Sequence, residues 1–372
     1  MKVRLFLFWI LFASLNSMAM IRYAAPVKQG NGNGMSVENA ADFLNAGFWI
    51  EVQKTLRKEP VIVKFMSGDY ARAYTEKPFI LEEMGNKKNA LTLEGDGQNT
   101  LFTVPVGYKQ QSVLMAVKNS QNIIIRNFNF TGSGKLGYAL QITSGKDNTT
   151  ENILVDNCTW TDMRGIIYGA TGVHQQGTSS VTYKDCSFKR VGIDSHSHFM
   201  YHAHYASNIH VVGCYFEDCT GDYVRFRDHC DYGDVENSTF VRTEKFPVYP
   251  FISVPLFNNI DPGDETFATH YTFTGNHFKN TKNAIAFHHY GFDPVGKHYL
   301  LTAAEGEILV NGTPEEKKRL LRQNFDVNTD DIKISNNTNV DITHTVVMGS
   351  FPKYGAQFKG WSGWGDISIF FN

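Results

Sequence analysis

The stretch NILVDNCTW (152–160) is followed by two similar stretches, SVTYKDCSF (180–188) and NIHVVGCYF (208–216), at intervals of 28 residues. Each alternates apolar or β-branched residues with polar ones and ends in an aromatic residue, which is typical of a short strand with one buried face. The series continues in both directions with NIIIRNFNF (122–130), YGDVENSTF (232–240), YTFTGNHF (271–278) and a weaker copy, DIKISNNTN (331–339). A strand unit repeated in this way indicates a stacked-repeat architecture.

The interval between copies is too short for a strand followed by a full helix in every repeat, but it fits one coil of two or three short strands. Stacked coils place equivalent residues about 4.8 Å apart, the spacing of hydrogen-bonded strands. We therefore expect an all-β fold, a single-stranded right-handed parallel β-helix, from about Val61 to about Asn339.

Two columns of inward side chains follow from this alignment. The five cysteines are an odd number, and none has the paired C-x-x-C spacing of structural zinc sites. Cys158, Cys186 and Cys214 recur at equal spacing, so we expect buried free thiols. The first column is Phe128, Cys158, Cys186, Cys214 and Ser238, and the second is Phe130, Trp160, Phe188, Phe216, Phe240 and Phe278.

The two ends of such a stack need covering. The segment 36–57 has the pattern of an amphipathic helix that caps the N-terminal end. Near the C-terminus, TPEEKKRLL (313–321) predicts a short helical insertion, with Thr313 as N-cap, Pro314 as first helical residue and Glu316 closing a capping box. Without any linker or composition break, residues 20–372 are expected to form one domain.

The first residues have the pattern of an export signal. Lys2 and Arg4 precede an apolar run that is too short to span a bilayer, and small residues follow it up to Ala19. We expect residues 1–19 to be a signal peptide, with a membrane anchor as the alternative, and a secreted or periplasmic protein with no membrane association after cleavage. The formal net charge of −2 gives no case for nucleic acid, and we expect a monomer.

Polar residues gather on the second strands of two neighbouring repeats, HFMYHAHY (198–205) and DYVRFRDH (222–229). Side chains alternate between the two faces of a strand. We place Val224 and Phe226 inside, with Arg225 and Arg227 outside. On the preceding coil we place His202 and His204 on the same outer face, outside the core. The sequence thus predicts a compact cationic cleft of two imidazoles and two guanidinium groups.

Such a cleft suits a polymer of uronic acids. Arginine binds a carboxylate with a planar fork, which acidifies the adjacent C–H group, and histidine is able to remove that proton near neutral pH. We predict Arg227 and His204 as catalytic residues, and tyrosine as proton donor or stacking surface. The predicted substrate-binding residues are His202, Arg225, Tyr201, Tyr205, Tyr223, His229 and His289.

Several alternatives stay open for these residues. The arginines can instead form ion pairs with Asp222, Asp228 and Asp231. The H-x-H spacing of His202 and His204 also suits a metal, but the sequence offers no convincing third ligand. We therefore predict no metal and no cofactor.

The stretch NIHVVGCYFEDCTGDYVRFRDH (208–229) resembles the pectin lyase-like β-helical enzymes of polysaccharide lyase family 6, which include chondroitinase B and alginate lyases. The resemblance covers about 40 residues and implies that Arg227 matches the family's catalytic arginine. His204 occupies the position of the family's lysine base. Ser197 and Phe199 stand where the family has calcium-binding acidic residues, so no calcium site is implied.

A second, shorter stretch, YGFDP (290–294), is similar to the Y-G-F-D-P-H motif of mannuronan epimerases, with Val295 in place of the histidine.

Three functions remain at this stage. The leading hypothesis is a lyase acting by β-elimination on an acidic polysaccharide or oligosaccharide. A glycoside hydrolase needs two carboxyl groups across the scissile bond, and a non-catalytic glycan-binding protein needs none. The carboxyl groups available for a hydrolase are Asp222, Asp228, Asp231, Asp261, Asp264 and Glu265.

Overall fold

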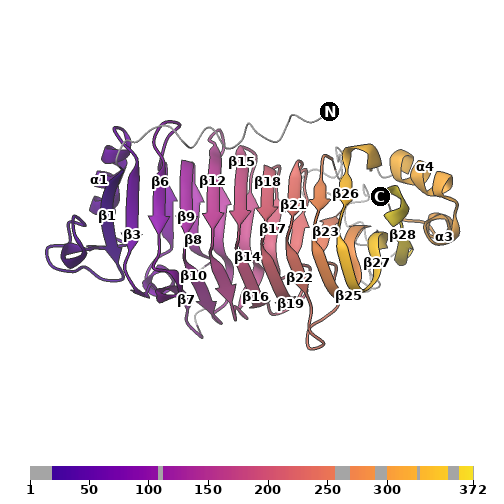
Figure 1. The fold of residues 1–372 in the computed structure, drawn as a ribbon, viewed down its shortest axis with the longest axis horizontal. Helices are drawn as coiled ribbons and strands as arrows, with labels where there is room; N and C mark the ends of the chain where they lie inside the picture. Colours follow the sequence, from indigo (N-terminus) through magenta and orange to yellow (C-terminus); the bar gives the residue numbers. More distant parts are fainter. Residues whose placement is uncertain are drawn as a thin grey trace.

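The computed structural model describes residues 19–107, 112–255, 269–289, 300–324, 327–350 and 360–371, and within these ranges it leaves the side chains of 289 and 324 undescribed. The molecule is an elongated stack of coils (Figure 1). One face is an 11-stranded parallel sheet. Its strands, in spatial order, are β2 (Ala41–Asp42), β1 (Met20–Ala25), β3 (Val61–Phe65), β6 (Leu91–Glu94), β9 (Gln121–Arg126), β12 (Thr150–Asp156), β15 (Thr178–Lys184), β18 (Ser207–Val212), β21 (Gly233–Glu236), β24 (Thr272–Thr274) and β26 (Lys333–Ser335).

The other faces belong to a 17-stranded sheet that bends around the coil in two arms. The first arm contains β4 (Gly68–Asp69), β7 (Thr100–Val104), β10 (Asn129–Gly132), β13 (Thr159–Thr161), β16 (Ser187–Val191), β19 (Tyr215–Cys219) and β22 (Thr239–Val241). The second arm contains β5 (Phe79–Glu82), β8 (Val113–Lys118), β11 (Leu136–Thr143), β14 (Ile166–His174), β17 (His198–Ala203), β20 (Val224–Phe226) and β23 (Ile252–Pro255). The long strands β25 (His277–His289) and β27 (Thr338–Ser350) run through both arms, and β28 (Gly363–Asp366) closes the sheet by antiparallel pairing with β27.

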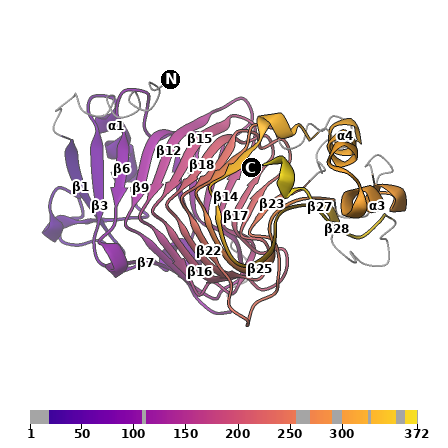
Figure 2. The same cartoon turned by 45° about the vertical axis from the view of Figure 1, so that its right-hand side comes forward.

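This architecture confirms the expected right-handed parallel β-helix, and Figure 2 shows its coils one behind another. The stack is longer than the repeats indicate. It begins with β1, which pairs with β3, and it continues through β27 to Ser350. The expected limits at Val61 and Asn339 were therefore wrong, because the terminal coils lack the motif that ends in an aromatic residue.

Both predicted columns are present. The registers align Phe130 with Trp160, Trp160 with Phe188, and so on to Phe278, and Phe102 extends the column by one coil. The rings of Trp160 and Phe188 stack at 4.5 Å and 7°. Cys158, Cys186 and Cys214 are buried free thiols. Toward the C-terminus the column continues with polar residues, and each side chain accepts a hydrogen bond from the backbone amide of the preceding column residue. These bonds run from the Cys214 amide to Ser238 Oγ at 3.1 Å, from the Ser238 amide to Asn276 Oδ1 at 3.0 Å, and from the Asn276 amide to Asn337 Oδ1 at 2.9 Å.

A left-handed corner residue turns the chain from the 11-stranded sheet into the first arm. Asparagine, aspartate and glycine adopt a positive φ more readily than other residues, which explains why each copy of the repeat has one of them before its column residue. The corner residues are Asn127, Asn157, Asp185, Gly213, Asn237, Gly275 and Asn336, with φ between 49° and 69°.

Helices lie at the two ends of the stack. α1 (Ala46–Leu56) lies at the N-terminal end and buries Phe48, Val52 and Leu56. The expectation of a helix from residue 36 was wrong for its first ten residues, because the Asn45 side chain accepts hydrogen bonds from the amides of residues 47 and 48 and starts the helix there. Among the described residues, the remaining helices are α2 (Arg72–Thr75) and the 3-10 turns Val37–Asn39, Gly97–Asn99, Thr329–Asp331 and Ser368–Phe370, besides those of the C-terminal insertion.

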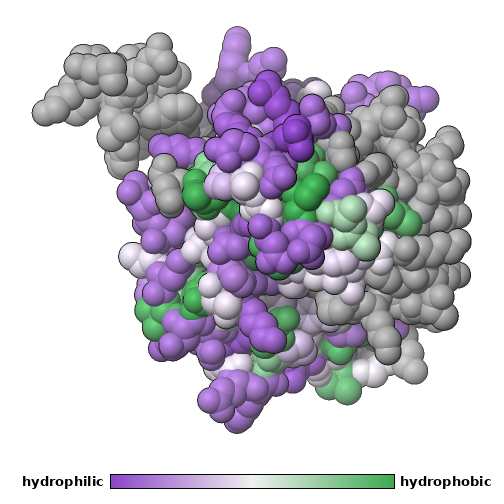
Figure 3. Space-filling model, turned by 90° about the vertical axis from the view of Figure 1, so that its right-hand side faces the viewer, coloured by the Kyte–Doolittle hydropathy of each residue, from purple (hydrophilic) through white to green (hydrophobic). Residues whose placement is uncertain are grey.

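The insertion contains α3 (Ala303–Asn311) and α4 (Pro314–Asn324). The predicted capping box before α4 is confirmed, since the Glu316 carboxylate accepts a hydrogen bond from the Thr313 amide at 2.8 Å and the Thr313 hydroxyl accepts one from the Glu316 amide at 3.3 Å. A second box, Thr302 with Glu305, starts α3, which the sequence analysis missed. At this end of the molecule, hydrophobic residues are scattered among hydrophilic ones (Figure 3). No helix in the described ranges is long and apolar enough to cross a membrane.

The cysteine column leads to a first prediction. Burial raises the pKa of the Cys158 thiol to about 12, so the folded protein should react slowly with a thiol reagent at pH 8. After denaturation without reductant, titration should count all five cysteines. Finding two disulfides, which would leave a single thiol to titrate, would mean that the column assignment is wrong.

Candidate functional site

The outer face of the second arm is fixed by the register between coils. β17 pairs with β20 so that Tyr201 lies beside Arg225 and His202 beside Phe226. Arg225 lies beside Ser253 on the next strand. Tyr201, Arg225 and Arg227 therefore belong to the outer face, as expected for the two arginines.

The placement of His202 on the outer face was wrong. Its side chain is fully buried in the core, with its ring 5.0 Å from that of Phe226 and 6.2 Å from that of Tyr183. The physical reason is the pairing of His202 with Phe226, since parallel partners point to the same face. Burial lowers the pKa of His202 to about 3, so His202 is a neutral core residue beneath the site.

His204 lies near the outer-face residues because the alternation stops before it. His204 and Tyr205 both have positive φ, 59° and 64°, and so do Asp228 and His229 at the same place on the next coil, 52° and 55°. The two turns are joined by a hydrogen bond from the Tyr205 amide to the Asp228 carbonyl at 2.8 Å. Consecutive non-glycine residues in this conformation store strain, and such strain clusters at functional sites.

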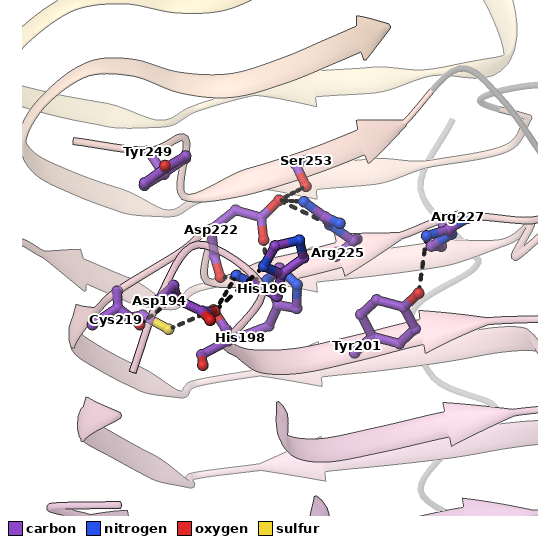
Figure 4. Close-up of polar contacts among 12 residues, drawn as sticks. Asp194, His196, His198, Tyr201, Cys219, Asp222, Arg225, Arg227, Tyr249 and Ser253 are labelled. Carbon is purple, nitrogen blue, oxygen red and sulfur yellow. Dashed lines mark hydrogen bonds and ion pairs between the residues drawn. The ribbon is translucent and has the colours of Figure 1, made fainter. Parts of the chain in front are cut away.

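A buried carboxylate holds the predicted catalytic residues together. The Asp228 side chain is 0% exposed, and its Oδ2 lies 2.9 Å from Arg227 Nε and 3.5 Å from His204 Nδ1. The other end of Arg227 donates from a terminal nitrogen to the Tyr201 hydroxyl at 3.0 Å, as Figure 4 shows. One carboxylate thus positions both the guanidinium and the imidazole, and Tyr201 completes the group.

The electrostatics favour a neutral His204. Partial burial lowers the pKa of His204, the nearby Arg227 lowers it further, and the Asp228 carboxylate opposes both effects. Asp228 Oδ2 lies on the Nδ1 side of the ring without a hydrogen bond to it. Its negative charge favours the ring proton on Nδ1, which leaves Nε2 as an acceptor. The side chain is 31% exposed, so a ligand can reach it.

A second buried carboxylate organises the other end of the same strands. Asp222 accepts hydrogen bonds from Arg225 Nε and a terminal nitrogen at 2.9 and 2.7 Å, and it also contacts His198 and Ser253 (Figure 4). Burial disfavours the charged carboxylate, but Arg225 and His198 outweigh it and hold the pKa of Asp222 well below its usual range. This cluster holds Arg225 in place on the outer face.

The expectation of a cationic cleft was therefore wrong. Arg225 is paired with the buried Asp222 and Arg227 with the buried Asp228, which agrees with the alternative that the arginines form ion pairs. Burial lowers the pKa of His198, His202 and His204. The site is a group of fixed hydrogen-bond donors and acceptors whose charges are largely balanced.

The remaining predicted residues fall into three groups. Tyr223 is 0% exposed and donates from its hydroxyl to the Val241 carbonyl at 2.7 Å, so the prediction that it contacts substrate was wrong. Tyr205 and His229 are half-buried at the strained turns, with their rings stacked at 4.8 Å. His289 ends β25, but its side chain lies outside the described residues, as do the 290–295 motif and the acidic residues at 261–265.

Two residues of the cluster, His174 and Tyr138, were not predicted from the sequence. His174 pairs with Ala203 on the next coil, and its ring lies 5.4 Å from that of His204 and 4.9 Å from that of Tyr138. Burial lowers the pKa of His174 to about 3. Continuing the alternation of β14 from Gly172 to His174 would have placed His174 on the outer face. No group of three or more metal-ligating side chains occurs within the described part of the chain.

No protein-family model matches the chain, and no curated protein matches it by sequence. Among solved structures, pectate lyase Pel9A is similar over 92% of this chain and 81% of its own, with 12% identity and a TM-score of 0.55. An alginate lyase from Paenibacillus sp. str. FPU-7 is 14% identical over 79% and 95% of the two chains, with a TM-score of 0.44. A mannuronic acid-specific family 6 lyase from human gut microbiota is 12% identical over 90% and 77%, with a TM-score of 0.36.

At such low identity, the likeness to Pel9A establishes the fold alone. The chain thus has the right-handed parallel β-helix fold, which it shares with Pel9A.

The burial of His202 leads to a second prediction. The pKa of His202 falls from its ordinary value of 6.5 to about 3 on folding. As the pH decreases, the unfolded state therefore binds a proton at this residue before the folded state does. Its stabilising effect is complete above pH 6.5 and is lost as the pH falls toward 3, by at most about 1.4 kcal/mol per pH unit. Replacing His202 by leucine removes this linkage, so the variant should lose less stability than the wild type between pH 7 and pH 4.

Urea denaturation at the two pH values measures this difference. The matched control is His196→Leu, whose side chain is 59% exposed, and it should behave as the wild type. Equal losses in wild type and His202→Leu would contradict the buried, neutral state of His202.

Proposed function

We propose that this chain is an exported polysaccharide lyase, which cleaves a uronic acid-containing polysaccharide by β-elimination. The observation that carries the proposal is the buried Asp228 carboxylate, which holds Arg227 and His204 on adjacent coils beside Tyr201. This arrangement supplies a fixed carboxylate-binding fork, a neutral base and a proton donor within one group. Export rests on the signal pattern of residues 1–19.

Each residue has one role in the proposed reaction. Arg227 binds the sugar carboxylate by charge-assisted hydrogen bonds, which strengthen as negative charge develops on that group. Nε2 of His204 removes the proton from the ring carbon that bears the carboxylate. The electron pair left behind forms a carbon–carbon double bond as the glycosidic C–O bond breaks.

Tyr201 supplies the proton to the departing oxygen. Burial raises the pKa of Tyr201, and the nearby Arg227 and Arg225 only partly offset this, so its hydroxyl is protonated at neutral pH. Of the three tyrosines considered from the sequence, we assign this role to Tyr201. Tyr223 is buried in the core and Tyr205 is stacked on His229. The likeness to a pectate lyase, an enzyme named for an acidic polysaccharide, is consistent with the proposal.

A glycoside hydrolase remains the second candidate because of one residue, Asp231. Asp222 and Asp228 are buried and ion-paired, so neither suits a carboxyl group that must reach a glycosidic bond. Asp231 is different, since it is half-buried and its burial raises its pKa, which is the usual state of a general acid. Of the other carboxyl groups considered from the sequence, Asp261, Asp264 and Glu265 lie outside the described ranges. A non-catalytic glycan-binding protein is the third candidate.

Product analysis on polygalacturonate, alginate and chondroitin separates the three functions. A lyase forms an unsaturated product that absorbs in the ultraviolet, together with new reducing ends. A hydrolase forms reducing ends alone, and a binding protein forms neither. The proposal expects ultraviolet absorbance with at least one of these polymers, and reducing ends alone would overturn it.

The third prediction concerns the catalytic residues. Arg227 was expected to be a surface residue, but it is 8% exposed and neutralises a buried carboxylate. Arg227→Ala should therefore destabilise the fold by about 3–5 kcal/mol. Arg227→Lys keeps the charge and removes the planar fork, and we expect it to lower kcat/KM on the order of a hundredfold with a folded protein. His204→Gln should lower kcat by about a hundred- to ten-thousandfold.

His210 offers a matched control for His204. It lies on the 11-stranded sheet, its Nδ1 is 2.7 Å from the Asp234 carboxylate, and its side chain is 33% exposed. His210→Gln should keep full activity. If His204→Gln is as active as the wild type while Asp231→Asn is inactive, the lyase mechanism fails and the hydrolase takes its place.

The fourth prediction is the pH dependence. The proposed base must be unprotonated, and the pKa of His204 lies below its ordinary value. Activity should therefore be full at pH 7 and should fall as the pH decreases through the lowered pKa, with an acid limb of kcat/KM below pH 6.5. An acid limb centred above pH 7 would show that a neutral His204 is not the base.

A further inference from the structure

A row of aromatic side chains leads away from the site along the outer face of the second arm. Tyr168 on β14 is 50% exposed, and its ring stacks on that of Tyr138 at 5.9 Å and 22°. Tyr138 is only 6% exposed, and its ring contacts that of Tyr201 at 6.4 Å. The row therefore starts in solvent at Tyr168 and ends at Tyr201, whose hydroxyl holds Arg227.

A glycine leaves the room that the middle ring of this row occupies. A Cβ on Gly172 would lie 2.6 Å from Cε1 of Tyr138. The ring of Tyr138 thus lies directly over the backbone of β14 where that strand has no side chain. A single exposed aromatic residue is ordinary, but Tyr168 is supported from below by a buried ring that belongs to the site cluster.

The coil register sets the spacing between Tyr168 and the catalytic group. β14, β17 and β20 are successive strands of the second arm. At about 4.8 Å per coil, the strand of Tyr168 lies about 10 Å along the axis from the strand that leads to Arg227. The registers align Phe226 with Val173 of β14, five residues after Tyr168, so Tyr168 is also displaced along the strand direction. This separation is too long for contact with the same sugar ring and is suited to another unit of the same chain.

We propose that Tyr168 is the stacking platform of a separate sugar-binding subsite, which lies two coils toward the N-terminus from Arg227. A pyranose ring presents an apolar face of C–H groups and a polar edge, and a half-exposed tyrosine offers an apolar face with a polar tip. The polysaccharide then crosses the second arm obliquely, at an angle to the axis of the β-helix, with its reacting unit at Arg227. This inference rests on the proposed function, and it adds the direction of the chain and a residue that binds without taking part in the chemistry.

The test measures binding apart from catalysis. Uronic acid oligosaccharides of increasing length, prepared from polygalacturonate and alginate, are titrated by calorimetry into the His204→Gln protein and into the same protein with Tyr168→Ala. Losing one stacking contact should weaken the binding of the longest oligosaccharides about three- to tenfold. Tyr168→Phe keeps the ring and should bind within about twofold of the parent. In the otherwise wild-type enzyme, Tyr168→Ala should raise KM and leave kcat unchanged.

Tyr215→Ala is the matched control, because Tyr215 is a partly exposed tyrosine on the outer face of the first arm. Unchanged affinity in Tyr168→Ala, with Arg227→Lys binding more weakly than the parent, would overturn the subsite and leave the proposed function standing. An equal loss in Tyr215→Ala would also overturn it, since the effect would not be specific. If the parent protein binds none of the oligosaccharides, the proposed function fails and the subsite fails with it.

Discussion

Parallel hydrogen bonding between successive coils determines where each side chain of this protein lies. Because each strand pairs residue by residue with the strand one coil away, every position is repeated along the axis in a column about 4.8 Å apart. The aromatic column, the cysteine column and the outer face of the second arm all follow from that register. A shift of one residue would exchange the inside and the outside of a whole strand.

The candidate site lies where this regularity is interrupted. Two successive coils each end their second-arm strand in a pair of non-glycine residues with positive φ, and these turns present His204 and Asp228. The buried Asp228 carboxylate is tolerable because Arg227 compensates its charge. Strain and a buried ion pair both cost stability, and the long hydrophobic core provides the excess that offsets them. What results is a rigid group of donors and acceptors with little net charge.

The sequence predicted the columns because their alternation is unambiguous, as in NILVDNCTW. It predicted the faces of β20 correctly for the same reason, since Val224 and Phe226 are clearly apolar. It failed for β17, where His, Met and His share one parity and Phe, Tyr and Ala share the other, so that composition does not identify the buried face. The strand itself is irregular, with Phe199 and Met200 both buried. The pairing of Arg227 with Asp228 and the turn at His204 depend on the register between coils, which no single strand reveals.

The central claim is that a sugar carboxylate binds at Arg227, on the outer face of the second arm, with the reacting carbon next to His204. The most direct measurement is a crystal structure of the His204→Gln protein with a bound uronic acid oligosaccharide. We expect a carboxylate within hydrogen-bond distance of the Arg227 guanidinium and a sugar ring adjacent to position 204. An oligosaccharide bound on the 11-stranded sheet or on the first arm, with the Arg227 region empty, would contradict it.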